Sequence, residues 1–207
     1  MNNIGTRATV CMLVLGSVGL TAYLGAASRP KTTPQTFIFG PSTWVPIVAD
    51  YRNRLGDKAA TGKYYRASDG STRLDVTSPD GQHTVVTILN VAENKQYSRN
   101  PLTGSWAVLT TPVGGILQTR VRATMPGLLQ GTEYRSDYLT YRRQTAGATF
   151  YLAPDLNFLQ VAIEHHDGSV EEYINIATTE PDRSVFEPPD GVALREASDV
   201  RDLLRFR

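Results

Sequence analysis

The sequence predicts an α+β fold built on an antiparallel β-sheet, and two observations carry this prediction. From residue 62 onward, short apolar segments alternate with turn motifs such as Asp69-Gly70 and Asp167-Gly168. Asp-Gly supplies the positive φ that hairpin turns need, and short connections between strands favour antiparallel pairing. Before residue 62, apolar side chains recur at a spacing of three to four residues, which is typical of one face of a helix.

The first 27 residues have the three-part plan of a secretory signal peptide. Arg7 precedes an apolar run over residues 10–20, and small residues follow at 25–27. This run is shorter than the roughly 20 residues that cross a bilayer as a helix. An uncleaved anchor is the alternative if the weaker residues out to Ala27 are counted. A single positive charge keeps the N-terminal end cytoplasmic, so we expect a periplasmic or extracellular folded part, either released or anchored by this helix.

Composition excludes several classes of protein. Cys11 is the only cysteine, and it follows Thr9 and Val10, so it lacks the small preceding residue of a lipoprotein-processing site. The exported part therefore has no disulfide framework, cysteine nucleophile or thiolate metal site. Without Arg7 its basic and acidic residues are equal in number and interspersed, which argues against a nucleic-acid partner.

The segments that follow the leader predict a linker and then one helix. Residues 28–42 contain three prolines and several threonines, which indicates an extended linker. Residues 43–55 predict an amphipathic helix that is capped by Ser42 and ends at Gly56. Its apolar face consists of Trp44, Ile47 or Val48, Tyr51 and Leu55.

Most of the remaining chain predicts strands. They cover residues 62–67, 72–77, 84–89, 95–98, 106–109, 134–143, 149–152, 160–165 and 170–176. Residues 113–131 predict one or two short helices broken by Pro126-Gly127, and residues 198–204 predict a closing helix capped by Ser198. The length after the leader suits one domain, which we expect to span residues 43–207.

Several motifs occur in a recognisable order. Gly62-Lys-Tyr-Tyr-Arg-Ala-Ser-Asp-Gly-Ser-Thr-Arg73 follows the predicted helix, Ser78-Pro-Asp-Gly81 leads into Val85-Val-Thr-Ile-Leu-Asn90, and Val185-Phe-Glu-Pro-Pro-Asp-Gly-Val192 comes near the end. From about residue 43 to 195 the chain resembles the periplasmic lipoprotein-carrier superfamily of outer-membrane lipoprotein carriers and lipoprotein-sensing half-barrel proteins.

This resemblance implies both a fold and a function. The fold is α+β, with a curved antiparallel sheet that forms an unclosed barrel and helices that cover its concave face. The function is a non-enzymatic carrier or sensor that works near a membrane, without a cofactor. Its partners would be a lipid, an acylated protein or another apolar ligand. Because one fold hosts many functions, a structural or protein-interaction module of the envelope is the alternative.

Alternation of side chains along the predicted strands gives a candidate apolar lining for the ligand. The register is open by one residue, and a slip exchanges the two faces of the sheet. The candidates are Tyr64, Leu74, Val76, Val85 or Val86, Ile88, Val108, Tyr138, Phe150, Leu152, Val161, Ile163 and Ile174. The same residues also fit a filled core, which is what the interaction-module alternative requires.

No catalytic or metal-binding residue is predicted. His165 and His166 are adjacent on a predicted strand and point to opposite faces, as do Glu171 and Glu172. A metal site would need one of these histidines with His83 and a carboxylate such as Glu164 or Asp167. Gly-x-Ser-x-Gly and phosphate-binding glycine loops are absent from the sequence. A hydrolase that uses His165 or His166 is the third and least favoured alternative, because the motifs of a catalytic site are missing.

Overall fold

The structure is a computed structural model, and it describes residues 35–39, 44–110, 121–125 and 129–204. Its elements are β1 (Gln35–Phe39), β2 (Ile47–Leu55), β3 (Lys58–Arg66), β4 (Thr72–Thr77), β5 (Thr84–Asn90), β6 (Lys95–Arg99), β7 (Trp106–Thr110), β8 (Val121–Met125), β9 (Leu129–Arg135), β10 (Tyr138–Gln144), β11 (Ala148–Ala153), η2 (Pro154–Leu156), β12 (Leu159–His165), β13 (Val170–Ala177), η3 (Arg183–Phe186), β14 (Leu194–Glu196) and α2 (Val200–Leu203).

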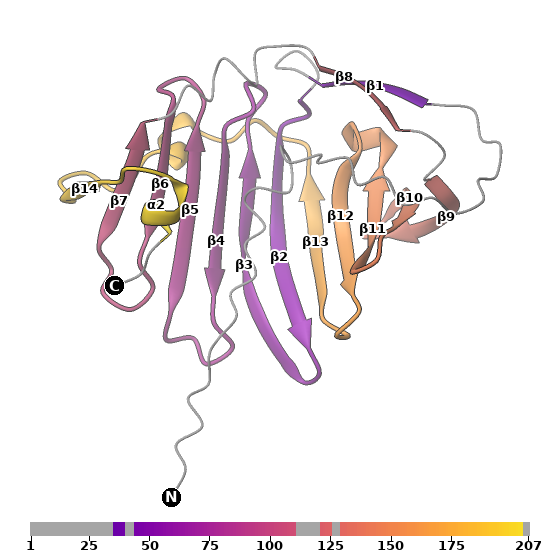
Figure 1. The fold of residues 1–207 in the computed structure, drawn as a ribbon, viewed down its shortest axis with the longest axis horizontal. Coiled ribbons are helices and arrows are strands. Elements are labelled where there is room, and N and C mark those ends of the chain that lie inside the picture. Colours follow the sequence, from indigo (N-terminus) through magenta and orange to yellow (C-terminus); the bar gives the residue numbers. More distant parts are fainter. Residues whose placement is uncertain (1–34, 40–43, 111–120, 126–128, 205–207) are drawn as a thin grey trace, which may run out of the picture.

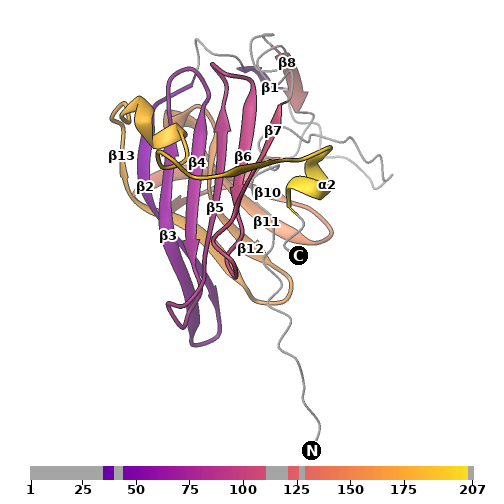
Figure 2. The same cartoon turned by 90° about the vertical axis from the view of Figure 1, so that its left-hand side faces the viewer.

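Twelve strands form one sheet in the order β14-β7-β6-β5-β4-β3-β2-β13-β12-β11-β10-β9, and β1 pairs with β8 in a separate two-stranded sheet (Figure 1). Neighbours in the large sheet are antiparallel, except that β14 pairs parallel with β7. The sheet does not close, because β9 and β14 lie at opposite edges. The side view shows that it is curved, with α2 on the concave side and η3 on the convex side (Figure 2).

The predicted α+β class, with helices covering the concave face, is wrong, because the described structure is nearly all β. Its one α-helix, α2, has four residues. The predicted helix over residues 43–55 is strand β2, in which Ile47, Ala49 and Tyr51 are buried and the residues between them are less buried. This period of two, and not the helical spacing, describes the segment, because β2 is hydrogen-bonded on both sides, to β3 and to β13.

Other expected elements were partly wrong. Within residues 113–131, which predicted helices, the described parts are β8 and the start of β9; residues 113–120 and 126–128 lie outside the described chain. The predicted strand 134–143 is two strands, β9 and β10, joined at Ser136 and Asp137, which both have positive φ. The closing helix is α2, and its cap is Asp199 rather than Ser198.

The expected leader, residues 1–27, also lies outside the described chain, while β1 falls within the expected linker. The remaining strand predictions are confirmed, and β4 has the predicted bounds. No helix in the described ranges has both the length and the hydropathy of a membrane span.

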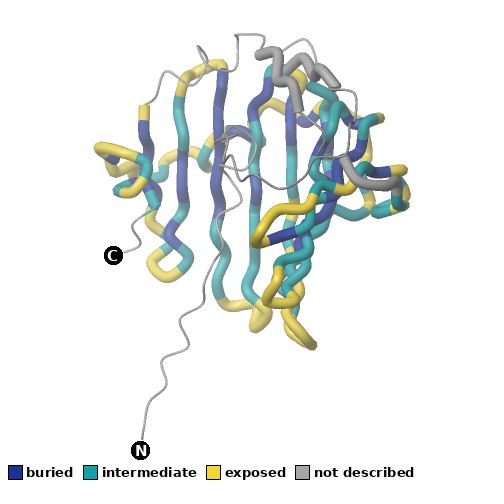
Figure 3. The backbone as a smooth tube through the Cα atoms, turned by 45° about the vertical axis from the view of Figure 1, so that its right-hand side comes forward, coloured by how far each residue is buried: buried dark blue, intermediate teal, exposed yellow. Residues whose placement is uncertain are grey.

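Three apolar clusters hold the sheet, and their residues appear as the dark segments of Figure 3. The first lies around β2, η2 and β12 and includes Ile47, Leu156 and Val161. The second lies on the convex face of β5 to β7, where Phe186 of η3 packs on it. The third joins β7 to α2 through Leu109, Leu203 and their neighbours.

Residues 181–193 form a strap across the convex face. Phe186 is 3% exposed and contacts the cluster that contains Trp106. Arg73 donates to the main-chain oxygen of Val185 at 3.0 Å, and the Asn90 side chain donates to that of Phe186 at 3.3 Å. The strap therefore closes this face with its own side chains.

Candidate ligand site on the concave face

One row of concave residues crosses five strands. Val85, Val76, Gly62, Tyr51 and Tyr173 lie opposite one another on β5, β4, β3, β2 and β13. Residues that are directly opposite share a face of the sheet. Val76, Val85 and Tyr173 are only half-buried. We call these five residues the concave row; it offers an apolar surface that keeps partial access to solvent.

Three tyrosines form an aromatic group at one end of the concave row. The Tyr64 and Tyr173 rings are stacked with centroids 4.6 Å apart, and the Tyr51 and Tyr173 rings are tilted with centroids 5.9 Å apart. Burial raises the pKa of the Tyr64 hydroxyl and raises that of Tyr173 well above the ordinary value. Both hydroxyls therefore stay neutral, and the group presents aromatic surface without charge.

Arg66 borders this group toward the start of β2. Its side chain donates to the main-chain oxygens of Val45 at 2.9 Å and Leu156 at 3.4 Å, and its guanidinium lies 5.2 Å from the centroid of the Trp44 ring. Burial lowers the pKa of Arg66. Within the described chain no carboxylate contacts it. Its hydrogen bonds instead link β3 to η2 and to the residues before β2, and they position these segments beside the aromatic group.

Glu171 borders the tyrosines on the other side. Its carboxylate is 3% exposed and accepts the Tyr51 hydroxyl at 2.9 Å, while its other oxygen lies 2.8 Å from Nε2 of His165. Beside it is a crevice between β12 and β13 with room for about one water molecule. An acyl chain does not fit in this crevice, so the candidate ligand surface is the concave row itself.

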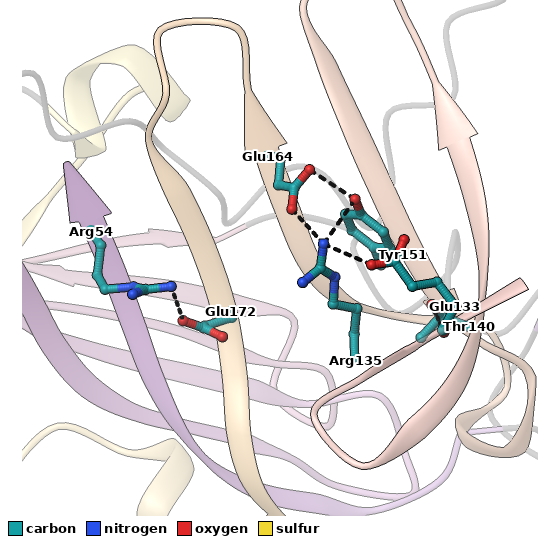
Figure 4. A network of polar contacts seen from close by, with 7 residues as sticks. All are labelled: Arg54, Glu133, Arg135, Thr140, Tyr151, Glu164 and Glu172. Carbon is teal, nitrogen blue, oxygen red and sulfur yellow. Dashed lines mark hydrogen bonds and ion pairs between the residues drawn. The ribbon is translucent and has the colours of Figure 1, made fainter. Parts of the chain in front are cut away.

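The convex face of β2 and β9 to β13 is charged instead. Arg135 lies 2.7 Å from Glu164 and 2.9 Å from Glu133, and stacks over the Tyr151 ring, whose hydroxyl donates to Glu164 at 2.8 Å (Figure 4). The hydrogen bond to Tyr151 is the main cause that raises the pKa of Arg135. These pairs are more than one-third exposed, where an ion pair is worth about 0–1 kcal/mol. They link side chains of β9, β11 and β12 and offer no apolar surface.

A second group of ion pairs joins β13 to β2 on the same face. Glu172 lies 2.9 Å from Arg52 and 3.3 Å from Arg54, and the latter pair is drawn in Figure 4. Lys63 of β3 pairs with Asp50 of β2. The hydrogen bond from Asn175, together with this contact, lowers the pKa of Asp50. The convex face of these strands therefore carries paired side chains of both charges.

The structure does not bring all predicted lining residues to one face. Tyr64, Leu74, Val76 and Val85 share the concave face, and Ile163, opposite Glu171 and Phe150, lies there too. The prediction is wrong for a second set, because the register turns these residues to the convex face; they are Ile88, Val108 and Ile174. Val161 and Tyr138 pack with the first cluster, and Leu152 is buried beside a β-bulge.

The histidines are dispersed. His83 follows the turn before β5, His166 is exposed in the turn after β12, and His165 contacts Glu171. In the described chain no three His, Cys, Asp or Glu side chains form a group that could hold a metal ion. Arg66, Tyr51 and Glu171 are concave residues that were not predicted from the sequence. The alternation Ile47, Ala49, Tyr51 against Asp50, Arg52, Arg54 was the signal that could have revealed β2 and its inner face.

Comparison with solved structures finds 28 matching chains, among them two distant ones, PNGF-II and MucB. No family model and no curated relative matches the chain. The structure of PNGF-II is 12% identical with a TM-score of 0.46 and matches 76% of this chain and 32% of its own. The crystal structure of MucB is 9% identical with a TM-score of 0.42 and matches 75% of this chain and 61% of its own. The chain thus spans less than two thirds of either protein, and these values carry no argument about function.

Proposed function

We propose that this protein is an exported, non-enzymatic carrier or sensor that binds an acyl chain, an acylated protein or another apolar ligand on the concave face of its half-barrel. We place it in the periplasm or outside the cell, near a membrane, as the N-terminal sequence and the family resemblance suggest. The observation that supports this proposal is the concave row, whose valines and Tyr173 are half-buried on the open side of an unclosed sheet.

Binding would come from desolvation rather than from charge. Each methylene that leaves water contributes roughly 0.8 kcal/mol, so a chain of several methylenes gains several kcal/mol against an apolar wall. The neutral hydroxyls of Tyr64 and Tyr173 add no charge of their own to that wall.

Native mass spectrometry of residues 28–207, purified from a cell envelope without detergent, tests this function. We expect an additional lipid or acyl mass on the wild-type protein and its loss in Val76→Lys, which places a charge in the concave row. Ile174→Lys is the matched control, because Ile174 is also half-buried but lies on the convex face. A wild-type protein that carries no additional mass and takes up no added fatty acid would refute the proposal.

The edge of the sheet supports a second candidate, an envelope protein-interaction module. Strand β9 is the last strand of the large sheet, and Tyr134 on it is 72% exposed, opposite Leu139 on β10. An edge strand with an exposed aromatic residue favours pairing with a strand of another protein. Site-specific crosslinking from position 134 in the cell envelope tests this candidate. A single recurrent protein partner supports it, and crosslinks to lipid alone reject it.

A further inference from the structure

The sheet has a weak seam between β12 and β13. Only three residue pairs join these strands, whereas nine pairs join β2 to β3. The three pairs lie next to the turn at residues 165–169, and pairing ends at Ala162 and Glu172. Beyond that point β13 continues along β2, and β12 continues along β11. The two strands therefore diverge with distance from their turn.

The space between the diverging strands lies at the end of the concave row. Its lining comes from both strands and from β2, and it includes Tyr51, Val161, Ile163 and Tyr173. Tyr51 and Tyr173 are members of the concave row. In the closed state this space holds no more than about one water molecule. If the seam opened, it would therefore open directly onto the concave row.

One polar side-chain contact crosses the seam, in addition to the apolar contacts that the first cluster makes around β2 and β12. In the described chain the hydrogen bond between Glu171 and His165 is the only polar side-chain contact between β13 and β12. Glu171 lies in the central pair of the three and also accepts the Tyr51 hydroxyl, so this contact ties β2, β13 and β12 together. Glu171 is buried, so water competes little for the hydrogen bonds at its carboxylate. We call Tyr51, Glu171 and His165 the latch.

We propose that β12 and β13 separate reversibly about the turn that joins them, that the latch holds them closed, and that the opened seam is the route by which the apolar ligand reaches the concave row. The identity of what passes rests on the proposed function, but the opening itself does not. Segments held by few main-chain hydrogen bonds open at lower free energy than the rest of a sheet. The turn stays formed as the hinge, with the His165 N–H donating to the Ser169 oxygen at 2.9 Å and the Ser169 hydroxyl donating to Asp167.

Hydrogen exchange tests the latch without any ligand. His165→Ala removes the β12 side of the contact at a residue that is partly exposed, so we expect the variant to fold. We expect amides of β12 and β13 to exchange about five-fold faster than in the wild type, the effect of losing one hydrogen bond. The matched control is His166→Ala, an exposed neighbour without this contact, and it should exchange as the wild type does. Unchanged exchange in His165→Ala would overturn the latch.

A disulfide across the seam tests the route. Ala162 and Glu172 are directly opposite, and opposite Cα atoms of antiparallel strands are about 4.5–5.5 Å apart, within disulfide range. The exported part has no cysteine that would compete with an Ala162→Cys, Glu172→Cys pair. The probe is a fluorescent fatty acid, and its uptake is timed by the change in its emission. Oxidised protein should take it up at least ten-fold more slowly than the same protein after reduction.

The two experiments separate the possible failures. Equal uptake rates in the oxidised and reduced proteins would overturn the seam as the route while leaving the carrier function in place. Absence of uptake by the wild type would refute the carrier function, and the exchange experiment would then still decide whether the seam opens. Faster exchange in His165→Ala together with slow uptake when oxidised supports both parts of the proposal.

Discussion

Replacing Phe186 by alanine should strongly destabilise the protein, because this side chain anchors the convex strap. Phe186 is 3% exposed and packs in the cluster with Ile88, Trp106 and Val108. Truncation of a buried phenylalanine to alanine costs about 3–5 kcal/mol, the sum of lost transfer free energy and the cavity left behind. With a urea m-value of about 2 kcal/mol/M, the midpoint of unfolding should fall by about 1.5–2.5 M.

Urea unfolding followed by tryptophan fluorescence and by far-ultraviolet circular dichroism measures this effect. Trp106 contacts the same cluster as Phe186, so fluorescence reports the strap, while circular dichroism reports the whole sheet. We expect the two transitions to coincide, since the strap closes the core of β5 to β7. Leu102→Ala is the control, because Leu102 is 71% exposed and its loss should change stability by less than about 0.5 kcal/mol. A loss below about 1 kcal/mol for Phe186→Ala would refute the role of the strap as a structural closure.

Three further substitutions test other parts of the fold. Gly62→Ala should prevent folding or lower the free energy of unfolding in urea by more than about 4 kcal/mol, because the new Cβ would lie 1.7 Å from the main-chain oxygen of Asp75. Near-wild-type stability of this variant would contradict the β3–β4 geometry. Burial raises the pKa of Tyr173 above the ordinary 10.0, so its neutral hydroxyl stabilises the fold fully below pH 10, and this contribution is lost as pH rises further. Tyr173→Phe should therefore flatten the decline of the urea midpoint between pH 9 and 11. An unchanged decline would show that other groups cause it. Thr140→Val removes the buried hydroxyl that donates to the main-chain oxygen of Glu133 at 2.7 Å, so the free energy of unfolding in urea should fall by about 1–2 kcal/mol. An unchanged free energy of unfolding would mean that this contact does not hold β9 to β10.

The sequence predicted the hairpins well, because their turns depend on local chemistry. Gly70, Gly81 and Gly168 all have positive φ in the turns where Asp-Gly motifs predicted it. The strands between these turns are short and have clear apolar positions, so β4 to β7 could be predicted within two residues at each end. Local signals of this kind do not depend on the rest of the fold.

The segment 43–55 could not be assigned correctly from apolar spacing alone. Trp44, Ile47, Tyr51 and Leu55 satisfy a helical period, yet β2 is a strand because β3 and β13 hydrogen-bond to both of its edges. That tertiary pairing overrides local preference. The exposed Leu55 shows the difference: on the expected helix it belongs to the apolar face, but in β2 it lies next to the turn of the β2–β3 hairpin.

The candidate site depended on register, which the sequence leaves open. Predicted lining residues such as Ile88 and Val108 were assigned to the same face as Leu74, but the pairing of Ile88 with Arg73 and Tyr97 turns it to the convex side. The latch was even harder to predict from the sequence. Glu171 and Glu172 are adjacent, and only the pairing of β13 with β2 and β12 decides which carboxylate is buried against Tyr51 and which contacts Arg52.

The two wings of the sheet are held in different ways, and this difference bears on function. The wing from β2 to β7 has long strand pairings and a strap closed by Phe186, and β14 covers its outer edge. The wing from β9 to β12 joins it through three residue pairs, one partly buried polar contact between side chains, the first apolar cluster and the hydrogen bond from Arg66 to Leu156. The free energy of local opening should therefore be lower at the seam than elsewhere in the sheet. Hydrogen exchange of the wild-type protein should accordingly find the amides of β12 less protected than those of β3. The proposed uptake of a large apolar ligand needs one wing that moves and one that keeps its shape, and this asymmetry is what that proposal predicts.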